Sequence, residues 1–108
     1  MAYDEDLANG IRECLAREGG VVEKRMFGGL AFLVNGNMAV AASGRGGLLV
    51  RVGDADTLLR RPHVTPMVMA GREMRGWLHV DAAALRTHRQ LQGWVRRGTD
   101  YARGLPPK

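Results

Sequence analysis

The stretch from residue 29 to 42 constrains the fold more than any other part of the chain. Its first six residues, Gly-Leu-Ala-Phe-Leu-Val, are continuously apolar, which is typical of a strand at the centre of a sheet. Asn35-Gly36 follows, and both positions tolerate the positive φ angles of a tight hairpin turn. Residues 37–42 return as a partner strand. An antiparallel hairpin is therefore predicted in the middle of the sequence.

More strands are predicted on both sides of this hairpin. Residues 21–26 carry the weakest strand pattern, because they are short and of mixed polarity. The glycine-rich run 44–47 is predicted to be a plain turn into a strand at 48–52, since a phosphate-binding loop would lead into a helix. A second hairpin is predicted from strands at 66–70 and 74–80, turning at Gly71-Arg72.

Helices are predicted at both ends of the chain. Apolar residues recur at helical spacing through residues 7–15, behind an acidic start and before Gly19-Gly20. A short helix capped by Asp54 is predicted to run through Arg60 and to end before Pro62, and a helical turn is predicted over 82–85. Thr87 and Gln90 form a capping box for the last helix.

The predicted order is α-β-β-β-β-α-β-β-α, which indicates an α+β fold. Two layers are expected, with the helices packed on one face of an antiparallel sheet. A parallel sheet would need long helical crossovers that this pattern lacks.

Composition predicts one domain, spanning residues 1–108. The chain is 45% hydrophobic, enough for one modest core, and no stretch approaches the roughly 20 apolar residues of a membrane span. The acidic N-terminus is unlike a secretory signal, so a cytoplasmic protein without membrane contact is predicted. Cys14 is the only cysteine, and we expect it to act as a small buried hydrophobe.

Charge divides the chain into two halves. Residues 57–108 carry ten basic and three acidic groups, whereas residues 1–56 carry six and eight. Fourteen of the sixteen basic residues are arginine, whose planar guanidinium suits phosphate and carboxylate. If they converge after folding, a basic face for phosphate backbones would comprise Arg60, Arg61, Arg72, Arg75, Arg96, Arg97 and Arg103.

Side chains for catalysis or metal binding are sparse. His63, His79 and His88 lack neighbours at metal-binding spacing, and no serine stands in a nucleophile motif. No metal, cofactor or enzymatic activity is therefore predicted. Phe27-Gly28-Gly29 bares backbone amides that a ligand could approach, but a structural bend or bulge packed under the helices is the favoured interpretation.

Four segments together resemble the TfoX N-terminal domain family. They are "RMFGGLAFLVNGNMAVA", "LLVRVGDAD", "PMVMAGREMRGWLHV" and "LQGWVRRGTDYARGLPPK". The residues that match the family pattern are Met26, Phe27, Gly28, Gly29, Gly36, Arg51, Gly71 and Trp94.

This resemblance implies a two-layer α+β fold of the secretion-chaperone-like type and a bacterial, cytoplasmic protein. Named members of the family regulate natural competence alongside a cyclic-AMP-responsive transcription factor. They carry a second, C-terminal domain, whereas this chain ends at Leu-Pro-Pro-Lys, so a stand-alone N-terminal domain is expected. The resemblance supplies no catalytic residues.

Three hypotheses for the function follow. The first is a non-catalytic regulatory or protein-interaction module, in which an edge strand pairs with a partner or forms a homodimer. The second is a nucleic-acid-binding accessory protein that uses the arginines, with Trp77 and Trp94 in the core or an interface rather than stacking on bases. The third is an enzyme or small-anion sensor with its site at Phe27-Gly28-Gly29.

Overall fold

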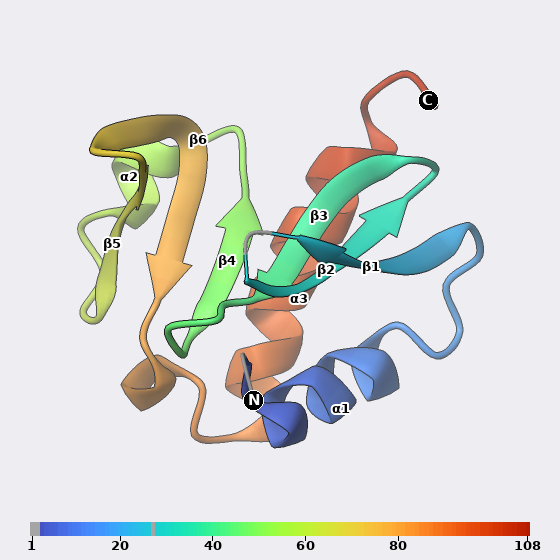
Figure 1. The fold of residues 1–108 in the computed structure, drawn as a ribbon, viewed down its shortest axis with the longest axis horizontal. Coiled ribbons are helices and arrows are strands. Elements are labelled where there is room, and N and C mark those ends of the chain that lie inside the picture. Colours follow the sequence, from blue (N-terminus) through green and yellow to red (C-terminus); the bar gives the residue numbers. More distant parts are fainter. Residues whose placement is uncertain (1–2, 27) are drawn as a thin grey trace.

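The computed structural model describes residues 3–26 and 28–108. It is an α+β fold with one antiparallel sheet (Figure 1), as predicted. The strands lie in the order β1-β2-β3-β4-β6-β5. The elements are α1 (Glu5–Cys14), β1 (Val21–Met26), β2 (Gly29–Val34), β3 (Asn37–Ala42), β4 (Leu48–Arg51), α2 (Ala55–Leu58), β5 (Val64–Met69), β6 (Arg72–Val80), η1 (Ala82–Ala84) and α3 (His88–Arg103).

The hairpin of β2 and β3 forms as the sequence predicts. Asn35 has φ 53° and Gly36 has φ 85°, the combination that closes a tight turn between twisted strands. The pairing shifts by one residue after Phe32, so β3 carries a bulge that the sequence did not reveal.

Side chains on one face of the sheet form the main core. Alternate residues of β2, β3, β4 and β6 pack there with residues of α1 and α3, because successive strand residues point to opposite faces. Figure 1 shows α3 behind β3 and β4. Large, fully buried members of this core are Phe32, Ile11, Leu48, Leu78 and Val40.

The bend or bulge predicted at Phe27-Gly28-Gly29, packed under the helices, does not form. Met26 pairs with Gly29 in an unbroken register, so the stretch joins β1 to β2 and no bulge enters the ladder. Gly28 has φ 74° and is exposed, rather than packed under helices. A Cβ at Gly29 would collide with the Ala42 carbonyl oxygen of β3. Phe27 lies outside the described residues.

Two boundaries differ from the sequence prediction. The second hairpin turns at Ala70-Gly71, both with positive φ, so Arg72 already pairs with Met69. The short helix α2 ends at Leu58, two residues before the predicted end at Arg60, and the Asp54 side chain makes no capping hydrogen bond. Both shifts reflect local hydrogen bonding, which residue preferences locate only to within a few positions.

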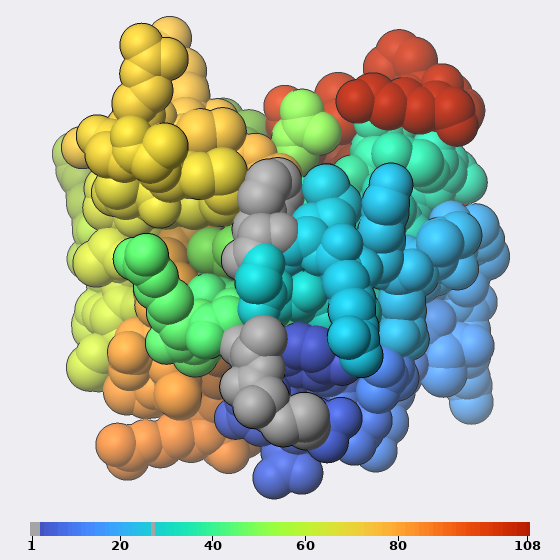
Figure 2. All heavy atoms as spheres, viewed as in Figure 1, coloured from blue at the N-terminus to red at the C-terminus, as the bar shows by residue number. Residues whose placement is uncertain are grey.

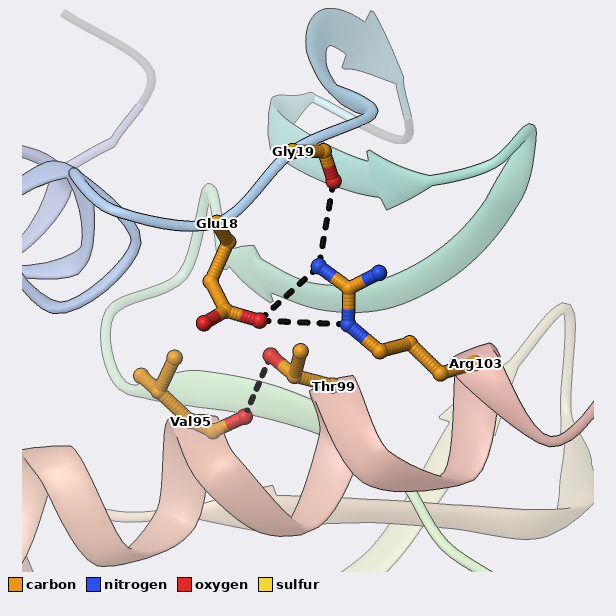
Figure 3. Close-up of polar contacts among 5 residues, drawn as sticks. All are labelled: Glu18, Gly19, Val95, Thr99 and Arg103. Carbon is orange, nitrogen blue, oxygen red and sulfur yellow. Dashed lines mark hydrogen bonds and ion pairs between the residues drawn. The ribbon is translucent and has the colours of Figure 1, made fainter.

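The last helix is held at both ends. Thr87 and Gln90 make the predicted capping box, with bonds of 3.1 and 3.0 Å. Near the other end, Arg103 donates to the Glu18 carboxylate and to the Gly19 carbonyl oxygen (Figure 3). Between them, the buried Thr99 hydroxyl donates to the Val95 carbonyl oxygen one turn earlier. The contacts of Arg103 tie α3 to the segment that links α1 with β1.

Candidate interaction surface

The sheet face opposite the main core carries a second apolar cluster, which we call the methionine face. All its members lie in strands, so no described helix contributes a side chain to it. Four of the six methionines of the chain belong to it. Its members are Met26, Ala31, Leu33, Met38, Ala41, Leu49, Met67, Met69 and Trp77.

The methionine face reaches the edge strand β1. Val22 pairs with Leu33, and residues that pair directly across strands point to the same face. Val22 is 60% exposed, and Met26 at the other end of β1 is half-buried. The apolar surface therefore continues to the open edge of the sheet, where a partner can approach.

The methionine face has a hollow near β5, at the edge of the sheet away from β1. A depression of about 620 Å³ is lined by Leu49, Met67 and Met69, with Arg45 and His79 beside them. His79 Nε2 lies 2.8 Å from the Gly46 carbonyl oxygen, which fixes the β3–β4 turn next to the hollow. Figure 2 shows that turn (green) projecting below the β5–β6 hairpin (yellow).

Charge around the methionine face is positive. Lys24 pairs with Ala31 and Arg72 pairs with Met69, so both cations lie on this side of the sheet. Only two acidic residues lie in strands of the described chain. Glu23 binds Arg12 of α1, and Glu73 lines a hollow with residues of α2. The face is thus apolar at its centre and cationic beside Lys24 and Arg72, while Asp56 and Glu73 share a hollow with its border residue Trp77.

Most residues of the family pattern shape turns and packing. Gly28, Gly36 and Gly71 have positive φ in hairpin turns. The Arg51 guanidinium lies 5.5 Å from the Tyr101 ring centroid, and Trp94 is buried in the main core. Of the described residues of this pattern, Met26 alone belongs to the methionine face.

A comparison with family models identifies the family of the chain. The model described as TfoX N-terminal domain matches residues 13–102. The chain belongs to the TfoX N-terminal domain family. Comparison with curated proteins and with solved structures gave no match.

The arginines of this TfoX N-terminal domain are distributed over several surfaces. Arg61 and Arg97 meet at Trp94, with guanidinium carbons 5.7 and 5.5 Å from its ring centroid. Arg72 and Arg75 lie on the β5–β6 hairpin. Arg60, exposed, follows α2.

The remaining two arginines of the predicted basic face lie beside acidic groups. Arg96 lines a hollow with Glu18 and Asp100, and Arg103 forms an ion pair with Glu18 at 2.8 Å. Neighbouring carboxylates weaken the attraction of such arginines for a phosphate backbone. Binding of nucleic acid through one arginine face stays a prediction.

The single cysteine lies at the end of α1. Cys14 is half-buried and packs against the main core. Burial raises the pKa of its thiol above the ordinary value of 9.0, and the charge of Glu13 acts in the same direction. A thiol in this state is a poor nucleophile.

Two negative findings concern metals and membranes. Within residues 3–26 and 28–108, no group of three or more His, Cys, Asp or Glu side chains is arranged to hold a metal ion. No helix in the same part of the chain has the length and apolar character needed to cross a membrane.

The sequence analysis did not predict that the apolar strand residues of the methionine face gather on one face of the sheet. The alternation of Met67, Val68 and Met69 indicated a strand but did not say what would cover its apolar side. The signal available was the concentration of methionine in strands at positions that alternate with core residues.

Proposed function

We propose that this TfoX N-terminal domain is a non-catalytic, cytoplasmic regulatory module that binds a protein partner through its methionine face. The observation that supports it most is an apolar sheet face built from strands alone. Four of its members are buried, and five are half-buried: Met26, Leu33, Met38, Met69 and Trp77. Half-buried apolar side chains gathered on one sheet face support an interaction site. The regulatory part of the proposal rests on membership of the family.

The composition of the face suits an adaptable partner site. Methionine has three rotatable bonds and a polarisable sulfur, so it fills irregular gaps and accommodates varied partner side chains. Trp77 adds a large rigid surface at its border, and aromatic residues supply much of the binding energy in interfaces.

The charge around the face selects the kind of partner. Lys24 and Arg72 lie on this side of the sheet, and Arg45 lines the hollow. The complementary occupant is an amphipathic helix with an apolar stripe flanked by aspartate and glutamate. Its stripe would contact the methionines, and its carboxylates would approach the three cations.

Methionine methyl signals provide a direct test. The protein is labelled with ¹³C at its methionine methyl groups and titrated with an acidic amphipathic helical peptide. The signals of Met38, Met67 and Met69 should shift, whereas Met74, which is exposed outside the cluster, should not. A peptide with lysine in place of its acidic residues is the matched ligand control.

Two substitutions sharpen this experiment. Met38→Gln should weaken binding of the acidic peptide, because it places an amide in the apolar contact, whereas the same change at Met74 should not. Arg72→Glu should also weaken binding of the acidic peptide. This loss should grow as the salt concentration is lowered, because salt screens the charge interaction. Equal binding of the acidic and basic peptides would contradict the proposal. Shifts of the same signals with protein concentration alone would assign the face to a second copy instead.

A further inference from the structure

A second hollow lies far from the methionine residues, between α3, η1 and the segment that links α2 to β5. Its volume is about 530 Å³, within the range of small-molecule sites. Three arginines contribute to its wall, one from the α2–β5 segment and two from α3: Arg61, Arg89 and Arg97. No aspartate or glutamate lines it.

Two of these cations contact the same aromatic ring. The guanidinium carbons of Arg61 and Arg97 both lie within 5.7 Å of the Trp94 ring centroid, so they are at most about 11 Å apart. Arg61 is exposed, so salt partly screens the repulsion between the two charges at such a separation. Arg97 is half-buried and Trp94 is 6% exposed.

The contact with Trp94 leaves the hydrogen-bonding edges of these arginines available. A cation–π contact uses the attraction of the ring for the positive charge, while the N–H donors of guanidinium project in its own plane. Among the described residues, the side-chain hydrogen bonds and ion pairs of arginine belong to Arg12 and Arg103. The donors of Arg61, Arg89 and Arg97 thus have no acceptor in the described chain.

The floor and rim of the hollow are fixed by backbone contacts. His63, which lines it, has φ 65°, and its carbonyl oxygen accepts a 2.9 Å bond from the Asp81 amide. The Asp81 carboxylate accepts instead from the Ala83 amide, where it caps η1. Asp81 is therefore engaged with η1, and the ion pairs of the described residues do not join it to the three arginines.

We propose that this hollow binds a small phosphorylated molecule, with a phosphate monoester or diphosphate group held by Arg61, Arg89 and Arg97. Guanidinium pairs with phosphate through two parallel N–H···O bonds, and a dianion would relieve the repulsion between the arginines. The hollow also exposes Pro62, Ala83 and Ala84, against which the organic part of the ligand packs. The site is distinct from the methionine face and does not depend on it.

The grouping of the three arginines around one hollow favours a small ligand over a nucleic-acid strand. Binding of a phosphate backbone calls for cations spaced along a track. Here the nearest arginine along α3 outside the hollow, Arg96, lines another depression together with Glu18 and Asp100. The three arginines instead surround one recess.

Isothermal titration calorimetry with inorganic pyrophosphate tests the proposal. We expect one site per chain, weakened about tenfold or more by Arg89→Gln, since each charge-assisted bond contributes roughly that factor. Arg96→Gln removes the same charge from the same helix and should leave binding nearly unchanged. Because Arg97→Gln also removes packing from Trp94, its folding is checked by circular dichroism before its binding is interpreted.

Further ligands distinguish the sources of the phosphate group. Adenosine diphosphate that binds more tightly than pyrophosphate, and competes with it, would indicate a nucleotide ligand. Equal binding of the two would indicate recognition of the phosphates alone. Both results support the proposal.

Three results would overturn it. The first is no heat of binding and no change in ³¹P signals at ligand concentrations up to about 10 mM. The second is equal weakening by Arg89→Gln and Arg96→Gln, which would mean attraction by net charge only. The third is binding of a single-stranded oligonucleotide that pyrophosphate cannot displace, which would assign the arginines to nucleic acid.

Discussion

Gly98 in α3 lies directly against Ala39 in β3. A Cβ built at Gly98 would stand 2.5 Å from the Ala39 carbonyl oxygen and 2.7 Å from Cγ1 of Val40. The absence of a side chain at this position lets α3 approach β3 closely.

Gly98→Ala should therefore destabilise the fold. Forcing a methyl group into this contact displaces α3 from β3 and should lower the free energy of unfolding by about 1–3 kcal/mol. Gly93→Ala in the same helix is the matched control, since nothing lies within 4 Å of a Cβ there. It should raise the free energy of unfolding by roughly 0.5–1 kcal/mol. Urea unfolding followed by circular dichroism measures both, and equal effects would disprove the close approach.

The ion pair between Arg12 and Glu23 should make a small, pH-dependent contribution to stability. Hydrogen bonds from Arg12 lower the pKa of Glu23 from its ordinary value of 4.5, with burial acting in the opposite direction. A carboxyl group with a lowered pKa stabilises the fold above its ordinary pKa, and loses this contribution as pH falls through the lowered value.

Urea unfolding at two pH values tests this link between α1 and β1. Glu23→Gln should lower the unfolding midpoint slightly at pH 7, because both side chains are more than a third exposed and solvent weakens such pairs. Well below the lowered pKa the difference from the parent protein should vanish. A difference that persists undiminished in acid would mean that packing, rather than charge, is responsible.

Asn37 should hold the C-terminal segment in place. Its side chain is buried and donates a 3.0 Å bond to the Pro106 carbonyl oxygen, while the Lys108 amide donates to the Asn35 carbonyl oxygen. Asn37→Ala should lower the free energy of unfolding by about 1 kcal/mol. It should also speed hydrogen exchange at the Lys108 amide, leaving amides in β6 unaffected. Unchanged exchange at Lys108 would show that Pro106-Pro107 orders the segment without Asn37.

The thiol of Cys14 should react slowly. Its pKa is raised by burial and by Glu13, so the thiolate fraction near neutral pH falls below that of an ordinary cysteine. Reaction with a disulfide reagent should be slower in the native protein than for Ala16→Cys in a Cys14→Ala background, where the residue at 16 is exposed. Faster reaction at Cys14 would reveal an activating group that the described contacts do not contain.

Several elements of the fold could be predicted because the residues that form them are neighbours in the chain. Asn35-Gly36 specifies a tight turn through its own φ preferences, and Thr87 caps α3 with a partner three residues away. Phe27-Gly28-Gly29 was harder: glycines permit either a bulge or a turn, and the choice depended on the pairing of Met26 with Gly29.

The candidate sites could not be predicted in the same way. Alternation along a strand says that two faces exist, but not which strands lie side by side. The sheet places β4 next to β6 and pairs Leu49 with His79, residues far apart in the sequence. That non-local pairing assembles the methionine face, and it shows why its members were seen only as separate strand residues.

The sequence by itself determined the α+β class, the order of the elements, the tight turns and the cap of α3, since each depends on short-range preferences and periodicity. Only the tertiary structure decided which arginines meet. Arg61 and Arg97 are brought together at Trp94, whereas Arg96, adjacent to Arg97, lines a hollow with Asp100. Neighbours on a helix point about 100° apart, and the packing of α3 against the sheet decides what each of them faces.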